Sequence, residues 1–230
     1  MKIKAVGFDI GQTIIQYNKP LNWKALYRPA LAGVLEACGL AVSEEKLVRG
    51  SEVLAKYNTR INDREYEVDS TVIFTDILCS WQADIKLLDP AKRSFYAFFQ
   101  NDASPFAEAE AVLRQLKERG IKIGVLTDVA YGMDSEYALA DIQSLAPYID
   151  VALTSVDVGY RKPHAKGFSI LLEQLAVAPA EMVFVGDEAK DMAGANQAGM
   201  YSLLINRDEQ EKDYAQRRTI HDLAGLLELV

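Results

Sequence analysis

The sequence predicts an α/β protein whose core is a doubly wound parallel sheet, interrupted by an inserted block of helices. From Pro105 onward, short apolar stretches alternate with amphipathic helical stretches, which is typical of βαβ units. Between the first apolar stretch, Ile3 to Phe8, and this region, residues 22–100 show helical spacing and no strand signal. Because the first stretch has no strand partner in the helical block, we expect it to join the later sheet.

The alternating region supplies the other strands and the helices that cover them. We expect strands at residues 121–128, 149–155, 181–187 and 201–206. Helices are expected at residues 105–120, 133–146, 164–176 and 189–199. Right-handed crossovers through such helices cover both faces of a parallel sheet.

The helical block contains four amphipathic stretches, at residues 21–39, 43–58, 69–82 and 90–99. Ser43, followed by two glutamates, is a typical N-cap, and Gly39 is a typical stop for the helix before it. Four helices with short connections predict a small bundle. We therefore place an α/β core domain at residues 1–15 and 101–230, and a helical domain at residues 16–100.

Composition narrows the class of protein. The 230 residues carry a formal net charge of -8, which argues against a nucleic-acid or anionic-membrane surface. No apolar run approaches a membrane span, so we expect a soluble, cytoplasmic protein that is a monomer or a homodimer. Cys38 and Cys79 lack metal-site spacing and are expected to be buried free thiols. With only two histidines, a histidine-rich metal site is excluded.

Polar residues follow the ends of several expected strands. They are Asp9, Thr127 with Asp128, Lys162, and Asp187 with Asp191. The carboxyl ends of parallel strands lie at one edge of a sheet, which is where open α/β sheets bind their ligands. The sequence therefore predicts that these side chains converge in one site.

The ordered set Asp9-x-x-x-Thr13, Thr127, Lys162-Pro163 and Gly186-Asp187-x-x-x-Asp191 resembles the four motifs of the haloacid dehalogenase-like (HAD) hydrolase superfamily. The resemblance covers nearly the whole chain. It implies a Rossmann-like core with a helical cap inserted after the first motif. It also implies a Mg²⁺-dependent phosphohydrolase that acts on a small phosphorylated substrate, with the cap as a lid.

The resemblance further implies a role for each motif residue. Asp9 would attack phosphorus and form an aspartyl-phosphate, which water then hydrolyses. Lys162 would supply positive charge to the phosphoryl oxygens, and Thr127 a hydroxyl donor. The Mg²⁺ ligands would be Asp9, the Gly11 carbonyl, Asp187 and, directly or through one water, Asp191.

The first motif departs from the family pattern at one position that matters for catalysis. Most phosphatases of this family carry Asp two residues after the nucleophile, whereas this chain has Gly11, followed by Gln12 where glycine is usual. A positioned acid or base contributes about 10²- to 10⁴-fold in rate. A second departure is Asp128, which stands where the family usually has Asn.

Three hypotheses accommodate Gly11. The first is a phosphohydrolase that is slow or specialised for good leaving groups, such as acyl or aryl phosphates. The second is a carbon–phosphorus hydrolase resembling phosphonoacetaldehyde hydrolase, with Lys46 or Lys56 as its Schiff-base lysine. The third is a non-catalytic or regulatory phosphate-binding protein. A dehalogenase fits least well, because the pair Asp187 and Asp191 suits a cation that dehalogenases do not use.

Three aromatic residues of the helical block, Trp23, Tyr27 and Tyr57, are expected in the bundle core. The sequence leaves open which of them, if any, faces the substrate.

Overall fold

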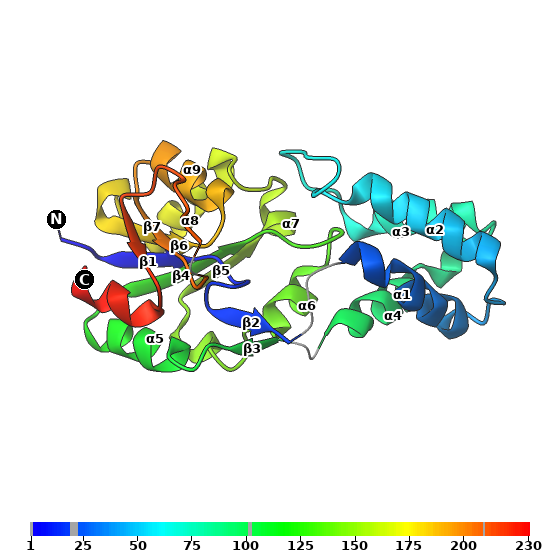
Figure 1. Cartoon of the computed structure of the whole chain (residues 1–230), viewed down its shortest axis with the longest axis horizontal. Helices are drawn as coiled ribbons and strands as arrows, with labels where there is room; N and C mark the ends of the chain where they lie inside the picture. The colour runs from blue at the N-terminus through cyan, green and yellow to red at the C-terminus, as the bar shows by residue number, and fades with distance from the viewer. Residues whose placement is uncertain (1, 19–22, 101–102, 209) are drawn as a thin grey trace.

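The computed structural model describes residues 2–18, 23–100, 103–208 and 210–230. Its main sheet has six strands in the order β5-β4-β1-β6-β7-β8, and every neighbouring pair is parallel (Figure 1). The strands are β1 Ala5–Phe8, β4 Lys122–Thr127, β5 Val151–Thr154, β6 Met182–Gly186, β7 Tyr201–Ile205 and β8 Arg218–Ile220. The predicted α/β fold class, with a parallel sheet, is therefore confirmed.

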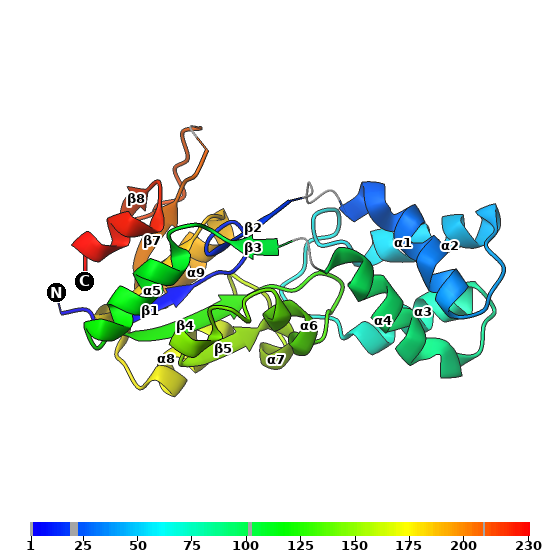
Figure 2. The ribbon, with the colours of Figure 1, turned by 90° about the horizontal axis from the view of Figure 1, so that it is seen from below.

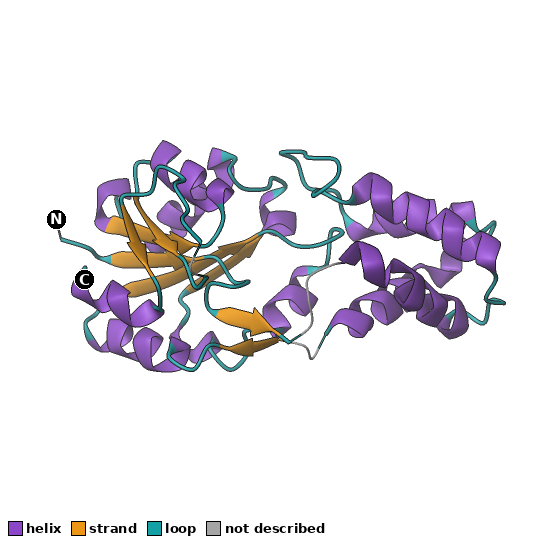
Figure 3. Cartoon of the chain, viewed as in Figure 1, coloured by secondary structure: helices purple, strands orange, loops and turns teal. Residues whose placement is uncertain are grey.

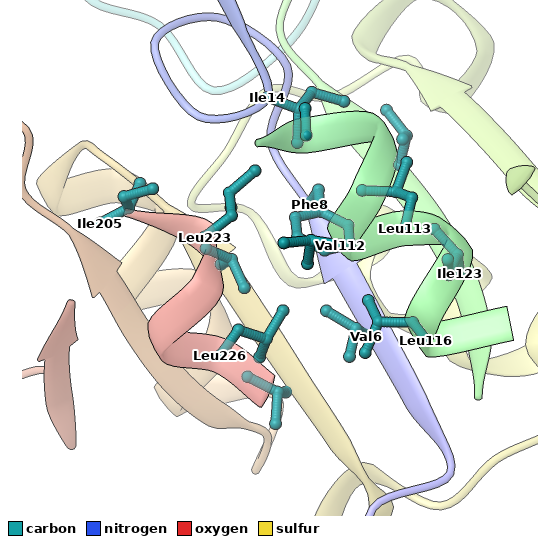
Figure 4. Packing of buried hydrophobic residues seen from close by; sticks show 14 of the residues in the cluster. Val6, Phe8, Ile14, Val112, Leu113, Leu116, Ile123, Ile205, Leu223 and Leu226 are labelled. Atoms are coloured by element: carbon teal, nitrogen blue, oxygen red, sulfur yellow. The ribbon is translucent and has the colours of Figure 1, made fainter. Parts of the chain in front are cut away.

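Helices cover both faces of this sheet (Figure 2). They are α5 Ala109–Glu118, α8 Ala165–Leu175, α9 Ala189–Gln197 and the 3₁₀ helix η4 Leu223–Glu228. On one face, β1 packs against α5 and η4 through buried side chains, shown in Figure 4, that include Val6, Phe8, Val112, Leu116, Leu223 and Leu226. On the other, β4 and β6 pack against α8 and α9 through a second cluster that includes Leu126, Phe168, Leu171 and Phe184. Both layers hold the strand ends rigidly, as a functional site requires.

A separate group of helices lies beyond the carboxyl ends of the strands (Figures 1 and 3). It consists of α1 Trp23–Ala37, α2 Glu44–Tyr57, α3 Ser70–Ser80, η1 Ile85–Leu87 and α4 Leu88–Phe99. Its own core contains Leu31, Leu35, Phe74, Phe95 and Tyr96, all fully buried. We call α1 to α4 the helical block.

The start of α2 and the end of α1 are formed by the residues that the sequence predicts. The Ser43 side chain caps α2 by accepting a hydrogen bond from the Lys46 amide at 3.3 Å. Gly39 follows α1 with φ +66°, a left-handed conformation that glycine adopts without strain.

Three short strands and two helices differ from the expectation. Strands β2 Ile15–Tyr17 and β3 Ala103–Pro105 form an antiparallel pair beside the sheet, and β8 extends its edge. Three residues are too few to produce a periodic pattern, so these strands left no sequence signal. The helix expected at residues 133–146 is confined to α6 Ser135–Ala140, and the four-residue helix α7 Ser155–Val158 was not expected.

The two cysteines are free, as expected, but they are not buried. Cys79 is exposed and Cys38 is half-buried. The prediction of buried thiols was wrong because Cys79 lies on the outer side of α3, whose buried residues are on the opposite face. None of the helices in the described part of the chain has the length and apolar composition needed to cross a membrane.

Gly194 in α9 allows a test of the packing between this helix and α8, with Gly33 in α1 as the control. A Cβ atom at Gly194 would overlap the ring of Phe168, whereas a Cβ atom at Gly33 would meet only Ser94 Oγ, at 3.8 Å. We expect Gly194→Ala to lower the free energy of unfolding by about 1–3 kcal/mol through overpacking. Gly33→Ala is the matched control and should raise it by about 0.5–1 kcal/mol, because alanine favours a helix interior. Urea unfolding of both variants measures the difference, and equal effects would contradict the predicted packing.

Candidate active site

Three neighbouring strands place polar residues at the same level of the sheet edge. Asp9 follows β1, and its amide donates to the Val185 carbonyl of β6 at 2.9 Å. Thr127 is the last residue of β4 and Asp187 follows β6 directly. The strand register aligns Phe8 with Val125 on one side and Val185 on the other, so the three polar residues emerge together. The predicted convergence of these motifs is present in the structure.

Lys162 lies at the centre of this group. Its Nζ is 2.6 Å from Asp9 Oδ1 and 2.6 Å from Asp191 Oδ1. The lysine is 5% exposed and Asp191 is fully buried, so these charges neutralise one another out of water. Burial opposes the charge of Lys162, but Asp191 and Asp9 outweigh it and raise the pKa of the lysine above its ordinary value. Lys162 is therefore a permanent cation.

Asp187 completes a cluster of three carboxylates. One oxygen from each of Asp9, Asp187 and Asp191 lies within 4.8 Å of the others. Burial and the negative charges of Asp9 and Asp191 raise the pKa of Asp187 to about 8. Burial likewise raises the pKa of Asp191 to about 6, although Lys162 opposes the shift. The cluster contains more negative charge than Lys162 neutralises, which is the condition for binding a cation.

Asp128 is balanced by a lysine that sequence reasoning missed. Lys190 Nζ is 2.9 Å from Asp128 Oδ2 and 2.8 Å from Glu188 Oε2, and the Lys162 amide donates to Asp128 Oδ1 at 3.0 Å. Burial disfavours the Asp128 charge, but Lys190 and Lys162 together with Arg161 lower the pKa of this carboxyl. Asp128, which replaces the usual Asn, is therefore neutralised by Lys190. The sequence offered one indication that Lys190 lies in the site, namely that it directly precedes Asp191.

Gly11 faces the ring of Tyr17. A Cβ atom at Gly11 would lie 3.2 Å from Tyr17 Cε2 and 3.3 Å from the Tyr17 hydroxyl oxygen. The φ angle of Gly11 lies outside the left-handed region, so its backbone is compatible with a side chain. Gln12, by contrast, has φ +56°, a conformation that favours glycine. The ring of Tyr17, and not backbone strain, is what limits position 11.

A cavity of about 500 Å³ opens between the sheet edge and the helical block. Asp9, Thr127 and Asp187 lie in its wall on the sheet side. On the other side it is lined by residues that include Trp23, Tyr57, Arg60 and Phe99. Of the three aromatic residues singled out from the sequence, Trp23 and Tyr57 thus line the cavity, and Tyr27 is buried in the block.

Trp23 and Tyr27 contact two other aromatic residues that line the cavity, Phe99 and Tyr131. The ring of Trp23 stacks on Phe99 with centroids 3.8 Å apart, and Tyr27 forms a hydrogen bond with the hydroxyl of Tyr131. Tyr131 follows β4 and lines the cavity, so the aromatic wall is continuous from the block to the sheet.

The loop between α2 and α3 joins the block to the site. The Glu67 carboxylate pairs with Arg161, the residue before Lys162, and accepts a hydrogen bond from the Ser155 hydroxyl at 2.6 Å. Arg60 from the same loop pairs with Glu188, the residue after Asp187. These two contacts connect the block directly to neighbours of the predicted site residues.

Lys46 and Lys56 do not line this cavity. The Lys46 ammonium donates to the Ala41 carbonyl at 3.2 Å, and Lys56 pairs with Asp76 at 2.9 Å with its side chain 63% exposed. Among the described lysines, those in the cavity wall are Lys24 and Lys190.

The fold and the site together define a protein with a parallel α/β core that carries a buried Asp–Lys pair and an acidic cluster at the carboxyl edge of its sheet. The chain belongs to the haloacid dehalogenase-like hydrolases, because the model of that family matches residues 3–199. The resemblance stated from the motifs is therefore confirmed.

Relatives with assigned names include phosphatases. The chain is 25% identical to a glyceraldehyde 3-phosphate phosphatase of Methanothermobacter thermautotrophicus, over 99% of this chain and 100% of that protein. It is 29% identical to the enzyme of the same name from Methanopyrus kandleri, over 91% of this chain and 86% of that protein. These similarities support a hydrolase of the phosphatase type.

A solved structure that is similar to this chain carries a different name. It is a 2-haloacid dehalogenase from Pseudomonas syringae pv. Tomato, with a TM-score of 0.71 and 26% identity, covering 99% of this chain and 97% of that chain. Overall likeness within the family therefore does not by itself separate the two reactions.

The half-buried carboxyl of Asp141, which also lines the cavity, gives a pH-dependent prediction. Burial raises its pKa from 3.8 to about 6, so folding disfavours its charged form. The resulting destabilisation is absent below pH 4, develops as the pH rises toward 6, and is complete above that. Because solvent screens part of the effect, we expect Asp141→Asn to raise the free energy of unfolding at pH 7 by about 1 kcal/mol.

Urea unfolding at pH 4 and pH 7 measures this effect, and the gain should be present only at pH 7. Asp63→Asn, at an exposed position, is the control and should change stability little at pH 7. An equal gain from Asp141→Asn at both pH values would contradict the assignment.

Proposed function

We propose that this protein is a Mg²⁺-dependent phosphohydrolase that cleaves a small phosphorylated metabolite through an aspartyl-phosphate on Asp9. The observation that carries this proposal is that Asp9 and Asp187 lie in the wall of one cavity at the sheet edge, with the buried Lys162 in contact with Asp9. A carboxylate nucleophile, a fixed cation and an acidic cluster are what phosphoryl transfer to a side chain needs.

Asp9 acts as the nucleophile in this proposal. Lys162 contacts Asp9 Oδ1 at 2.6 Å and so restricts the rotation of the carboxylate. As the bond from Asp9 to phosphorus forms, the bond from phosphorus to the leaving oxygen breaks. Water then attacks the phosphorus, releases inorganic phosphate and regenerates the Asp9 carboxylate. Lys162 and the Thr127 hydroxyl stabilise the negative charge on the phosphoryl oxygens in both steps.

The residues present fit a hard divalent cation. The three carboxylates of the cluster offer only oxygen donors, and their mutual repulsion contributes to the raised pKa of Asp187. Mg²⁺ prefers this chemistry and keeps part of its water shell. Asp9, the Gly11 carbonyl and Asp187 would hold it, with Asp191 bound directly or through one water. When bound, it neutralises charge between the carboxylate and the phosphate.

The helical block acts as a lid in this proposal. It lies beyond the carboxyl edge of the sheet (Figure 1). Its residues Trp23 and Phe99 line the same cavity as Asp9. The contacts of Glu67 and Arg60 bring it against the strand ends. A lid in this place excludes water and selects the substrate's organic group.

The substrate class follows from the cavity and the relatives. A volume of about 500 Å³ suits a small metabolite. The two relatives described above are named as phosphatases of glyceraldehyde 3-phosphate, a three-carbon sugar phosphate. Another relative, from Clostridium perfringens, is named a putative pyrophosphatase. We infer a small phosphate ester or anhydride as the substrate.

Mg²⁺ binding tests the metal site. Calorimetric titration of the wild type should show binding, and Asp187→Asn should weaken it by about 10-fold or more, because a ligand is lost. Asp89→Asn, at an exposed position of α4, is the matched control and should leave binding unchanged. Unchanged affinity in the Asp187 variant would remove the assignment.

Phosphate release tests the reaction. A screen of phosphate esters and acyl phosphates with Mg²⁺ should find a substrate, and Asp9→Asn should lower its turnover by about 10³-fold or more, because the nucleophile is removed. Phosphate binding without turnover by the wild type would instead favour the phosphate-binding or regulatory role.

The similarity to a 2-haloacid dehalogenase favours one competing reaction. In that reaction Asp9 would attack carbon and displace a halide. The acidic cluster argues against it, because Asp187 and Asp191 suit a divalent cation, which the displacement of a halide from carbon does not need. Halide release from a 2-haloacid, without phosphate release from any ester, would establish the dehalogenase reaction instead.

A further inference from the structure

Most phosphatases of the family carry an aspartate at the position of Gly11. In this chain the side chain of Tyr17, at the end of β2, lies in the space next to that position. Tyr17 lies against Gly11, with its hydroxyl oxygen 3.3 Å from the position of a Cβ atom on that glycine. A carboxylate on residue 11 would begin from this position. The phenolic hydroxyl therefore occupies the start of the space that the family's usual acid would take.

The chain path after β1 brings Tyr17 back to this position. The amides of Ile14 and Ile15 both donate to the Ile10 carbonyl, at 3.0 and 3.2 Å, which closes a tight turn through Gln12. Strand β2 then pairs antiparallel with β3, with Tyr17 opposite Ala103. This pairing fixes the backbone of Tyr17 within the core and not within the helical block. The ring is half-buried and packs against the core cluster of the sheet.

The hydroxyl of Tyr17 is available as a donor. No hydrogen bond joins it to another described residue, and Tyr17 lines the same cavity as Asp9. A tyrosine hydroxyl is protonated at neutral pH, so this group has a hydrogen to donate.

We propose that Tyr17 is a further catalytic residue, which donates a hydrogen bond to the leaving-group oxygen of the bound phosphate ester. This role rests on the proposed phosphohydrolase function. As the bond from phosphorus breaks, its electron pair moves onto the leaving oxygen, and the Tyr17 hydroxyl stabilises the charge that develops there. The leaving group takes its proton from solvent water, and Tyr17 retains its own. Gly11 then leaves room for the ring, because a Cβ atom there would lie only 3.2 Å from Tyr17 Cε2.

The test is a series of phosphate esters with leaving groups of increasing pKa, from 4-nitrophenyl through phenyl to alkyl. Tyr17→Phe keeps the ring and removes only the donor. We expect kcat/KM to fall by about 10²-fold for alkyl esters and by less than about 3-fold for the 4-nitrophenyl ester, whose leaving group needs little stabilisation. The plot of rate against leaving-group pKa should become steeper in the variant.

The matched control is Tyr148→Phe. The Tyr148 hydroxyl donates to Glu110 at 3.0 Å, and this tyrosine does not line the cavity. Its loss should leave the rates on all esters unchanged.

A second pair of variants tests whether a carboxyl group at position 11 can replace the Tyr17 hydroxyl as the group that stabilises the leaving oxygen. Gly11→Asp alone is crowded by the Tyr17 ring, so it is combined with Tyr17→Ala. Compared with Tyr17→Ala, the double variant should hydrolyse alkyl esters about 10-fold faster or more, because a carboxyl group now occupies the vacated space. The gain on the 4-nitrophenyl ester should be small.

The outcomes separate this inference from the proposed function. If the wild type hydrolyses esters but Tyr17→Phe changes all rates equally, or none, the tyrosine only packs against Gly11 and the inference is overturned. If the wild type releases phosphate from no ester and no anhydride, or Asp9→Asn retains full activity, the proposed function itself is overturned, and the role of Tyr17 with it.

Discussion

The buried contact of Lys162 with Asp9 and Asp191 is the interaction on which the site depends. These residues come from a loop after α7, from the end of β1 and from the start of α9. Both distances are 2.6 Å, and the lysine side chain is 2% exposed. Removing one partner of such a buried pair typically costs about 3–5 kcal/mol, because the remaining charge is left uncompensated. The loops at the sheet edge are therefore held in place by the same charges that define the site.

Two of the departures from the family pattern, Gly11 and Asp128, are each matched by a neighbouring side chain that the sequence order does not reveal. Asp128 is neutralised by Lys190, at 2.9 Å, and Gly11 leaves room for the ring of Tyr17. A change of charge or volume in a packed interior is tolerated when the local environment changes with it. The site thus differs from the usual family arrangement at Asp128 and Gly11, and the neighbouring Lys190 and Tyr17 accommodate the two differences.

The helical block depends on the core for its position and contributes the other wall of the cavity. Its internal packing is centred on Phe74, Phe95 and Tyr96, and the same apolar cluster includes Tyr131 and Met133 from the segment after β4. The block therefore contacts the core through apolar side chains as well as through the ion pairs from Glu67 to Arg161 and from Arg60 to Glu188. The first pair is buried, whereas the Arg60 side chain is 76% exposed, so the second pair contributes little to the stability of the interface. Together these contacts hold the block over the cavity, where the proposed lid has to lie.

Much of the fold was determined by the sequence alone. Alternating apolar and amphipathic stretches specified the parallel sheet, and the ends of its strands identified Asp9, Thr127 and Asp187, because the periodicity of an element is a local property. Contacts between distant residues are not local, and only the tertiary structure decided them. It placed Tyr17 over Gly11, paired Lys190 with Asp128, and left Lys46 and Lys56 outside the cavity. Three-residue strands such as β2 are too short for a periodic signal, so the pairing that positions Tyr17 appears only when the chain is folded.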